Sequence, residues 1–203
     1  MRDFWVRHQW PAGEHRWHWH LLPPPGAACH LVDAYQLDAR AEVDAVPAAW
    51  MHMTLLSVGP TATLSAAALE RMVGLVRARC AGLPPVGLTL GPAYVGGSAV
   101  MLRVAPTGPV TALRQVLVDA VGEALGTSYA GAFVPHISLG YGSADRDDDT
   151  DLQQWLDARH TDPVDITVGQ IALVDQVQDL TARQYRWAPR TNVDLTSGKG
   201  QGL

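Results

Sequence analysis

Apolar and polar residues alternate in several short runs of this chain, as they do in β-strands that bury one face. Longer stretches between these runs carry apolar residues at helical spacing. The alternating runs predict strands at 15–22, 50–58, 86–90, 100–104 and 134–141, and a closing hairpin formed by 166–173 and 184–187. The helical spacing predicts helices at 27–37, 64–79, 107–125 and 150–159. This mixture of strands and helices predicts an α+β fold.

The two ends of the chain lack such patterns. Residues 1–14 are mixed in character and contain Pro11-Ala12-Gly13, so we expect an irregular N-terminal arm with Trp5 and Trp10 packed on the body. Residues 191–203 are rich in small and polar residues, which predicts a disordered tail. We therefore expect a single bilobal domain over residues 1–190.

Two of the predicted strands carry the same four-residue pattern. His52-Met53-Thr54-Leu55 and His136-Ile137-Ser138-Leu139 both read histidine, apolar, hydroxyl, apolar. Side chains alternate between faces along a strand, so each histidine shares a face with its hydroxyl while the apolar residues face the core. The separation of 84 residues (136 − 52) predicts two similar halves that each contribute one histidine.

Two histidines that face one cleft are suited to acid–base chemistry, because the ordinary pKa of histidine lies near neutral pH. One ring can accept a proton while the other donates one. The hydroxyls of Thr54 and Ser138 can donate hydrogen bonds to the non-bridging oxygens of a phosphate. This pairing predicts a bell-shaped pH profile with limbs on either side of about pH 6.5.

The paired tetrads resemble the signature of the two-histidine (2H) phosphoesterase superfamily, which includes bacterial and archaeal RNA 2′,3′-cyclic phosphodiesterases, also called 2′-5′ RNA ligases. The order of strands and helices supports the resemblance from about Trp17 to Trp187. Family members often carry a basic residue soon after the second tetrad, where this chain has Gly140-Tyr141-Gly142.

The resemblance implies a two-lobed fold of duplicated antiparallel sheets, with outer helices, around a central cleft. It also implies metal-independent cleavage of a 2′,3′-cyclic phosphate on an RNA end or a small nucleotide, with His52 and His136 as catalytic residues and no cofactor. Thr54 and Ser138 would bind the phosphate, and the reverse reaction would be 2′-5′ ligation.

Further aromatic and imidazole side chains are candidates for lining the cleft. His18 and His20 share one face of the first predicted strand, and Tyr141 and Tyr185 lie in or near the later ones. Trp187, in the closing hairpin, is a further candidate. Together with His15, the two strand histidines also suit a metal site, although no carboxylate or cysteine lies beside them at ligand spacing.

Two alternatives to a metal-independent phosphodiesterase therefore remain. One is a metal-dependent hydrolase that uses His15, His18 and His20, and the other is a non-catalytic nucleotide- or RNA-binding module on the same fold.

Composition and charge limit the kinds of ligand that the protein is expected to bind. The chain has 203 residues, 47% of them hydrophobic, and a net charge of −5 with no run of Lys or Arg. A strong basic surface for nucleic acid is thus absent, which favours a small nucleotide or a short RNA as partner.

Cys29 and Cys80 form no CxxC motif and predict buried free thiols in the cytoplasm. No stretch is apolar enough to suggest a membrane partner, and we expect a monomer.

Overall fold

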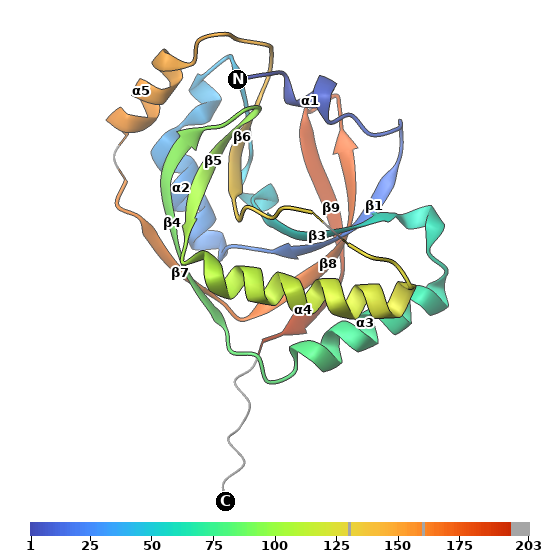
Figure 1. The fold of residues 1–203 in the computed structure, drawn as a ribbon. Helices are drawn as coiled ribbons and strands as arrows, with labels where there is room; N and C mark the ends of the chain where they lie inside the picture. Colours follow the sequence, from blue (N-terminus) through green and yellow to red (C-terminus); the bar gives the residue numbers. More distant parts are fainter. Residues whose placement is uncertain (130, 160, 196–203) are drawn as a thin grey trace, which may run out of the picture.

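Figure 1 shows the computed structural model of the chain, which describes residues 1–129, 131–159 and 161–195. Two antiparallel sheets form its framework. The four-stranded sheet has the order β3 (Met53–Pro60), β1 (His15–Leu21), β8 (Gln170–Asp179), β9 (Gln184–Asp194). The five-stranded sheet has the order β2 (Val43–Ala45), β6 (Ile137–Gly142), β5 (Ala99–Ala105), β4 (Val86–Val95), β7 (Val164–Val168). The predicted α+β fold with two antiparallel sheets is confirmed.

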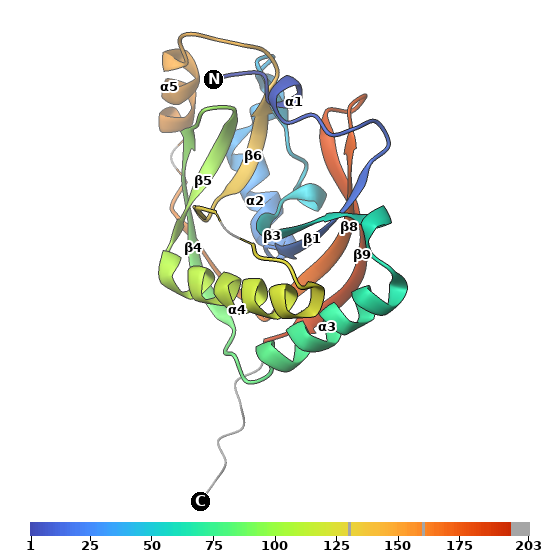
Figure 2. The ribbon, with the colours of Figure 1, turned by 45° about the vertical axis from the view of Figure 1, so that its right-hand side comes forward.

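The helices lie around these sheets. They are α1 (Phe4–Arg7), α2 (Pro25–Tyr35), α3 (Ala66–Cys80), α4 (Thr107–Leu125) and α5 (Thr150–Ala158), with single 3₁₀ turns η1 (Leu37–Ala39), η2 (Ala48–Trp50) and η3 (Thr61–Thr63). Figures 1 and 2 show α3 and α4 packed side by side beneath the sheets. One continuous hydrophobic core joins residues of both sheets and of α2, α3, α4 and α5, whereas Trp5 of α1 belongs to a second, smaller cluster.

Local sequence explains the main helix boundaries. Ser65 caps α3, since its hydroxyl accepts a hydrogen bond from the Ala68 amide at 3.2 Å. Gly126 ends α4 in the left-handed region, with φ at +66°. Between these signals the helices bury the apolar positions of one face, which for α4 are Val110, Leu113, Leu117, Ala120, Val121 and Ala124.

The strand order corrects the expectation that the lobes are successive halves of the chain. β1 and β3 come early in the sequence, but β8 and β9 return from its end to complete the same sheet. The predicted strand at 166–173 is in fact two strands, β7 and β8, separated at Gly169. Gly169 and Gln170 interrupt the apolar residues of this segment at the break, a signal that the prediction of one strand did not take into account.

The prediction of a disordered tail from residue 191 is wrong for its first part. Thr191 pairs with Leu173 and Val193 pairs with Ile171, so β9 continues to Asp194. Leu195 is 2% exposed, and its amide donates a hydrogen bond to the Gly169 carbonyl at 2.7 Å. Val193 and Leu195 are the apolar residues that hold this segment on the core. Residues 196–203 lie outside the described part of the chain.

The N-terminal arm is not irregular throughout. The Asp3 carboxylate accepts hydrogen bonds from the amides of Trp5 and Val6 and so caps α1. Trp5 is buried, as expected. Cys29, in contrast, is exposed on α2, whereas Cys80 is buried, and burial raises the pKa of its thiol to about 11. Among the described residues, no helix combines the length and apolar character needed to cross a membrane.

Candidate active site

The two tetrads meet at one cavity, although they begin on different sheets. His52 follows η2 and directly precedes β3, while His136 directly precedes β6, so each histidine lies immediately before a strand rather than within it. The cavity has a volume of about 160 Å³. Its lining residues are Phe4, His18, His52, Thr54, His136, Ser138, Tyr141, Gln176 and Tyr185. Both histidines and both hydroxyls therefore face the same space.

The two histidines are held by the same local contact. Nδ1 of His52 donates a hydrogen bond to the Trp50 carbonyl at 2.9 Å, and Nδ1 of His136 donates one to the Val134 carbonyl at 2.9 Å. Each bond joins the ring to the backbone two residues earlier, and each fixes the proton on Nδ1. Nε2 is consequently the nitrogen that each neutral ring can use to accept a proton from a substrate.

His52 is surrounded by rings on several sides. The His20 ring stacks on it with centroids 4.2 Å apart and an interplanar angle of 22°, and the Trp187 ring meets it edge-on at 4.8 Å. Burial in these surroundings outweighs the opposing hydrogen bond to Trp50 and, together with the nearby His136, lowers the pKa of His52 to about 4. His52 is therefore neutral at pH 7.

His20 does not line the cavity, contrary to expectation. It is fully buried behind His52, and neither of its ring nitrogens has a hydrogen-bond partner among the described residues. Burial lowers its pKa well below the ordinary value, so the ring is neutral. Alternation along β1 places His20 on the face of the cleft, but it does not reveal that the ring of His52 covers it.

His18 does line the cavity, and two hydrogen bonds hold it. Its Nδ1 donates to Oε1 of Gln176 at 3.0 Å, and the Ser57 hydroxyl donates to its Nε2 at 2.9 Å. Burial lowers the pKa of His18 to about 4, which fits this neutral bonding pattern. With Oε1 engaged by His18, Gln176 has its amide NH₂ group to offer to a ligand. Gln176 lies in β8, far along the chain from either tetrad, so no local sequence pattern predicts it as a site residue.

Aromatic residues form the other part of the cavity wall. Tyr141 and Tyr185 both line it, as does Phe4 from α1, which the sequence analysis did not predict. Burial raises the pKa values of both tyrosines, so their hydroxyls stay protonated. The nine lining residues include no Lys or Arg. An anion in this cavity would thus be bound by imidazole, hydroxyl and amide donors.

The histidines of β1 do not form a metal-ligand set. Nδ1 of His15 lies 2.8 Å from Oδ1 of Asp175, whereas His18 bonds to Gln176 and His20 packs against His52. Within residues 1–129, 131–159 and 161–195, no group of three or more His, Cys, Asp or Glu side chains is arranged to hold a metal ion. The side-chain arrangement therefore does not favour the metal-dependent alternative.

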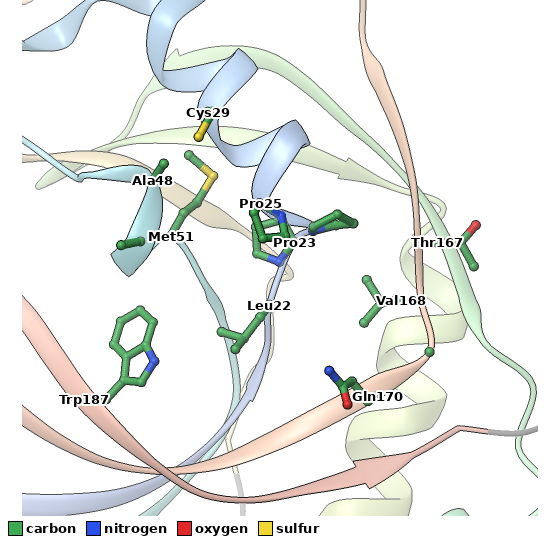
Figure 3. Close-up of a pocket in the computed structure, with 13 residues that line it drawn as sticks. Leu22, Pro23, Pro25, Cys29, Ala48, Met51, Thr167, Val168, Gln170 and Trp187 are labelled. Atoms are coloured by element: carbon green, nitrogen blue, oxygen red, sulfur yellow. The ribbon is translucent and has the colours of Figure 1, made fainter.

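A larger cavity adjoins this site at Trp187. Figure 3 shows the indole on one side of a space of about 530 Å³, opposite Val168 and Gln170. Leu22, Met51 and the Pro23–Pro25 segment also line it, and no residue of either tetrad contributes to it. The groups suited to proton transfer are therefore in the smaller cavity.

Comparisons with known proteins agree with this arrangement. A family model described as the 2′-5′ RNA ligase superfamily matches residues 23–180. E. coli LigT in complex with 3′-AMP is 18% identical, with a TM-score of 0.67 over 90% of this chain and 99% of that chain. The protein TT0787 of Thermus thermophilus is 20% identical, with a TM-score of 0.67 over 91% of this chain and 99% of that chain. A structure described as a phosphoesterase is 18% identical, with a TM-score of 0.64 over 90% and 99% of the two chains. No curated protein sequence matches the chain.

Proposed function

The chain belongs to the 2′-5′ RNA ligase superfamily of phosphoesterase- and ligase-like enzymes, and from this premise we propose that it is a metal-independent cyclic phosphodiesterase. Its substrates are 2′,3′-cyclic phosphates on RNA ends or small nucleotides, and ligation to a 2′-5′ bond is the reverse reaction. One observation carries the proposal: two identically anchored histidines line one cavity with two hydroxyls. Complexes of E. coli LigT with 3′-AMP, ATP and NADP⁺ support a nucleotide as the ligand class. A monomeric, bilobal, cytoplasmic protein is part of the same proposal.

Hydrolysis of the cyclic phosphate requires two proton transfers. A water oxygen forms a bond to phosphorus while one histidine accepts the proton that the water loses. The bond from phosphorus to one ribose oxygen breaks, and the other histidine protonates that oxygen. Thr54 and Ser138, with the Gln176 amide, donate hydrogen bonds to the non-bridging oxygens as charge accumulates there.

The surroundings of the two histidines suggest how they divide these roles. His52 is enclosed by rings and is neutral at pH 7, so we assign it the role of base. The other role, protonation of the departing ribose oxygen, then falls to His136, the second imidazole of the pair that lines the cavity.

Turnover of a panel of 2′,3′-cyclic nucleotides tests the proposal. His52→Ala and His136→Ala should each lower kcat/KM by roughly 10²- to 10⁴-fold, the usual effect of removing a positioned acid or base. Thr54→Val and Ser138→Ala should each cost about 10-fold, because each removes one hydrogen bond to a charged oxygen. His30→Ala, which alters an exposed histidine on α2, should leave kcat/KM unchanged.

Thermal unfolding of each variant separates a lost proton carrier from a lost fold. Full activity in EDTA is expected, and loss of activity there would favour a metal-dependent hydrolase. Affinity for the cyclic nucleotides without product would instead favour the binding module. Undiminished turnover by both histidine variants would rule out the two-histidine mechanism.

A further inference from the structure

The N-terminal arm, residues 1–14, spans both sheets at one end of the cleft. On the side of the five-stranded sheet, the Arg2 amide donates to the Gly97 carbonyl at 2.8 Å, and Nε1 of Trp5 donates to Asp44 at 3.0 Å. On the side of the four-stranded sheet, the Trp10 amide donates to the Gln178 side chain at 2.7 Å. Both ribbon views show α1 between β6 and β9 (Figures 1 and 2). The arm therefore links the two lobes.

An arginine fixes the middle of this link. The Arg183 guanidinium, at the tip of the β8–β9 hairpin, bonds to Asp44 at 2.6 Å through Nε and to Asp3 at 3.2 Å through an Nη atom. Asp44 belongs to the five-stranded sheet and Asp3 to the arm. Three separate segments of the chain thus meet at one side chain, which holds α1 in a defined position.

Within the arm, Phe4 reaches the catalytic cavity. Its ring lies 4.3 Å from that of Tyr141 and 5.9 Å from that of Tyr185, measured between centroids, and all three rings line the cavity. The cavity therefore has one aromatic wall and one wall of hydrogen-bonding groups. A nucleotide has the same two-sided character, with a planar base at one end and a phosphate at the other.

The size of the cavity limits what it can enclose. Its volume of about 160 Å³ is below the roughly 300–1,000 Å³ of typical ligand pockets, so it cannot enclose a whole nucleotide. With the phosphate between the histidines, the base must extend along the aromatic wall. Phe4 and Tyr185 are the parts of that wall that lie outside the segment matching the family model, residues 23–180, and Phe4 is the one that precedes it.

We propose that the N-terminal arm is a substrate-selecting element, in which Phe4 forms the surface that packs against the base of the nucleotide bearing the cyclic phosphate. This inference rests on the proposed function and extends it. It assigns recognition of the base to a segment that takes no part in the proton transfers of the two histidines. Packing of a base on an aromatic ring tolerates any base, so the element selects for the presence of a base rather than for its identity.

A comparison of substrates with and without a base tests this proposal in the full-length chain. The wild-type protein should hydrolyse 2′,3′-cyclic AMP and 2′,3′-cyclic CMP with a kcat/KM roughly 5- to 100-fold above that for ribose 2′,3′-cyclic phosphate. Phe4→Ala should remove most of this difference by raising KM for the nucleotides, with little change for the ribose compound. Phe4→Trp should retain the preference. Val6→Ala, in the same helix at a side chain that is 75% exposed, should behave as wild type.

Two outcomes would overturn the proposal. The first is an equal preference for the base in the wild-type protein and Phe4→Ala. The second is a Phe4→Ala variant with unchanged thermal unfolding in which kcat/KM falls by the same factor for the cyclic nucleotides and for ribose 2′,3′-cyclic phosphate. If Phe4→Ala does not fold, Phe4→Leu keeps the apolar volume and removes the aromatic face, and the same comparison applies.

A separate measurement distinguishes failure of this inference from failure of the proposed function. If no cyclic phosphate is turned over, calorimetric binding of 3′-AMP and of ribose 3-phosphate still decides the role of Phe4. Tighter binding of 3′-AMP that Phe4→Ala abolishes would support the element, and equal affinities would refute it.

Discussion

His52 and His136 have the same backbone anchor but different neighbours. Each ring donates from Nδ1 to the carbonyl two residues earlier, so the repeated sequence gives a repeated contact. Beyond that contact, His52 lies among the rings of His20 and Trp187, whereas His136 is exposed. The sequence therefore predicts the pair, but the difference between its members depends on residues from other strands.

This difference changes the expected pH profile. The tetrads alone predict limbs on either side of pH 6.5, but burial lowers the pKa of His52 to about 4. Protonation of His52 removes the base, so kcat/KM should fall as the pH drops through about 4. The limb at higher pH reports the loss of the proton from the proton donor. A pH–rate profile on a cyclic nucleotide checks this, and an acid limb that stays at about 6.5 would contradict it.

His20 should control the position of that acid limb. His20→Ala removes the stacked ring and admits water beside His52, so the limb should move from about pH 4 toward 6.5. His20→Phe keeps the ring and removes two nitrogens without hydrogen-bond partners among the described residues, so the limb should stay and thermal stability should hold or rise. Profiles and melting curves of both variants provide the measurement. An acid limb at the same pH in His20→Ala and His20→Phe would show that the stacked ring does not affect the pKa of His52.

The elements whose apolar residues recur at a regular spacing were predicted from the sequence. Those that form through contacts with distant parts of the chain were not. The spacing of apolar residues located α4, and alternation located β1. β2 (Val43–Ala45) has only three residues, too short for a period, and it forms because it pairs with β6. The end of β9 looks polar in sequence, yet its pairing with β8 orders it. Phe4 and Gln176 reach the cavity from elements that no local pattern connects to the tetrads.

Gly142 illustrates how an element accommodates the arm. It lies in the stretch after the second tetrad where a basic residue was expected from the family resemblance. A Cβ atom at this position would lie 2.3 Å from the Arg2 carbonyl oxygen. The close approach of the arm thus requires glycine here.

Gly142→Ala should therefore displace the arm. We expect it to lower the free energy of unfolding by roughly 1–3 kcal/mol, the usual cost of inserting a group into a packed site, and to raise KM for cyclic nucleotides. Gly87→Ala is the matched control on β4, because a Cβ atom there has no neighbour within 4 Å. Urea unfolding and steady-state kinetics of both variants test the expectation, and equal stability of the two would exclude a tight contact between the arm and β6.

At the scale of the whole molecule, several histidine side chains in and behind the cleft are held in their neutral form. Burial lowers the pKa values of His18 and His52 to about 4 and lowers that of His20 as well. In the unfolded chain each histidine titrates near 6.5. Between these values the unfolded state binds more protons than the folded state, so the contribution of these residues to stability is complete above about pH 6.5 and decreases below it.

The protein should therefore lose stability in mild acid. Each of these histidines should lower the free energy of unfolding by up to about 1.4 kcal/mol per pH unit below 6.5. His20→Phe, which has one imidazole fewer, should show a shallower slope. Chemical denaturation at pH 7, 6 and 5 measures both slopes. A free energy of unfolding that is constant over this range would show that the imidazoles are not held neutral.

The position of the arm along the chain has a consequence for how this enzyme could diversify. The tetrads lie within residues 23–180, the part that matches the family model, whereas Phe4 lies ahead of it. Under the proposals above, reactivity and selectivity are therefore encoded by separable lengths of polypeptide. A different leading segment could be exchanged as a cassette, giving the same catalytic framework a new substrate range without altering either histidine.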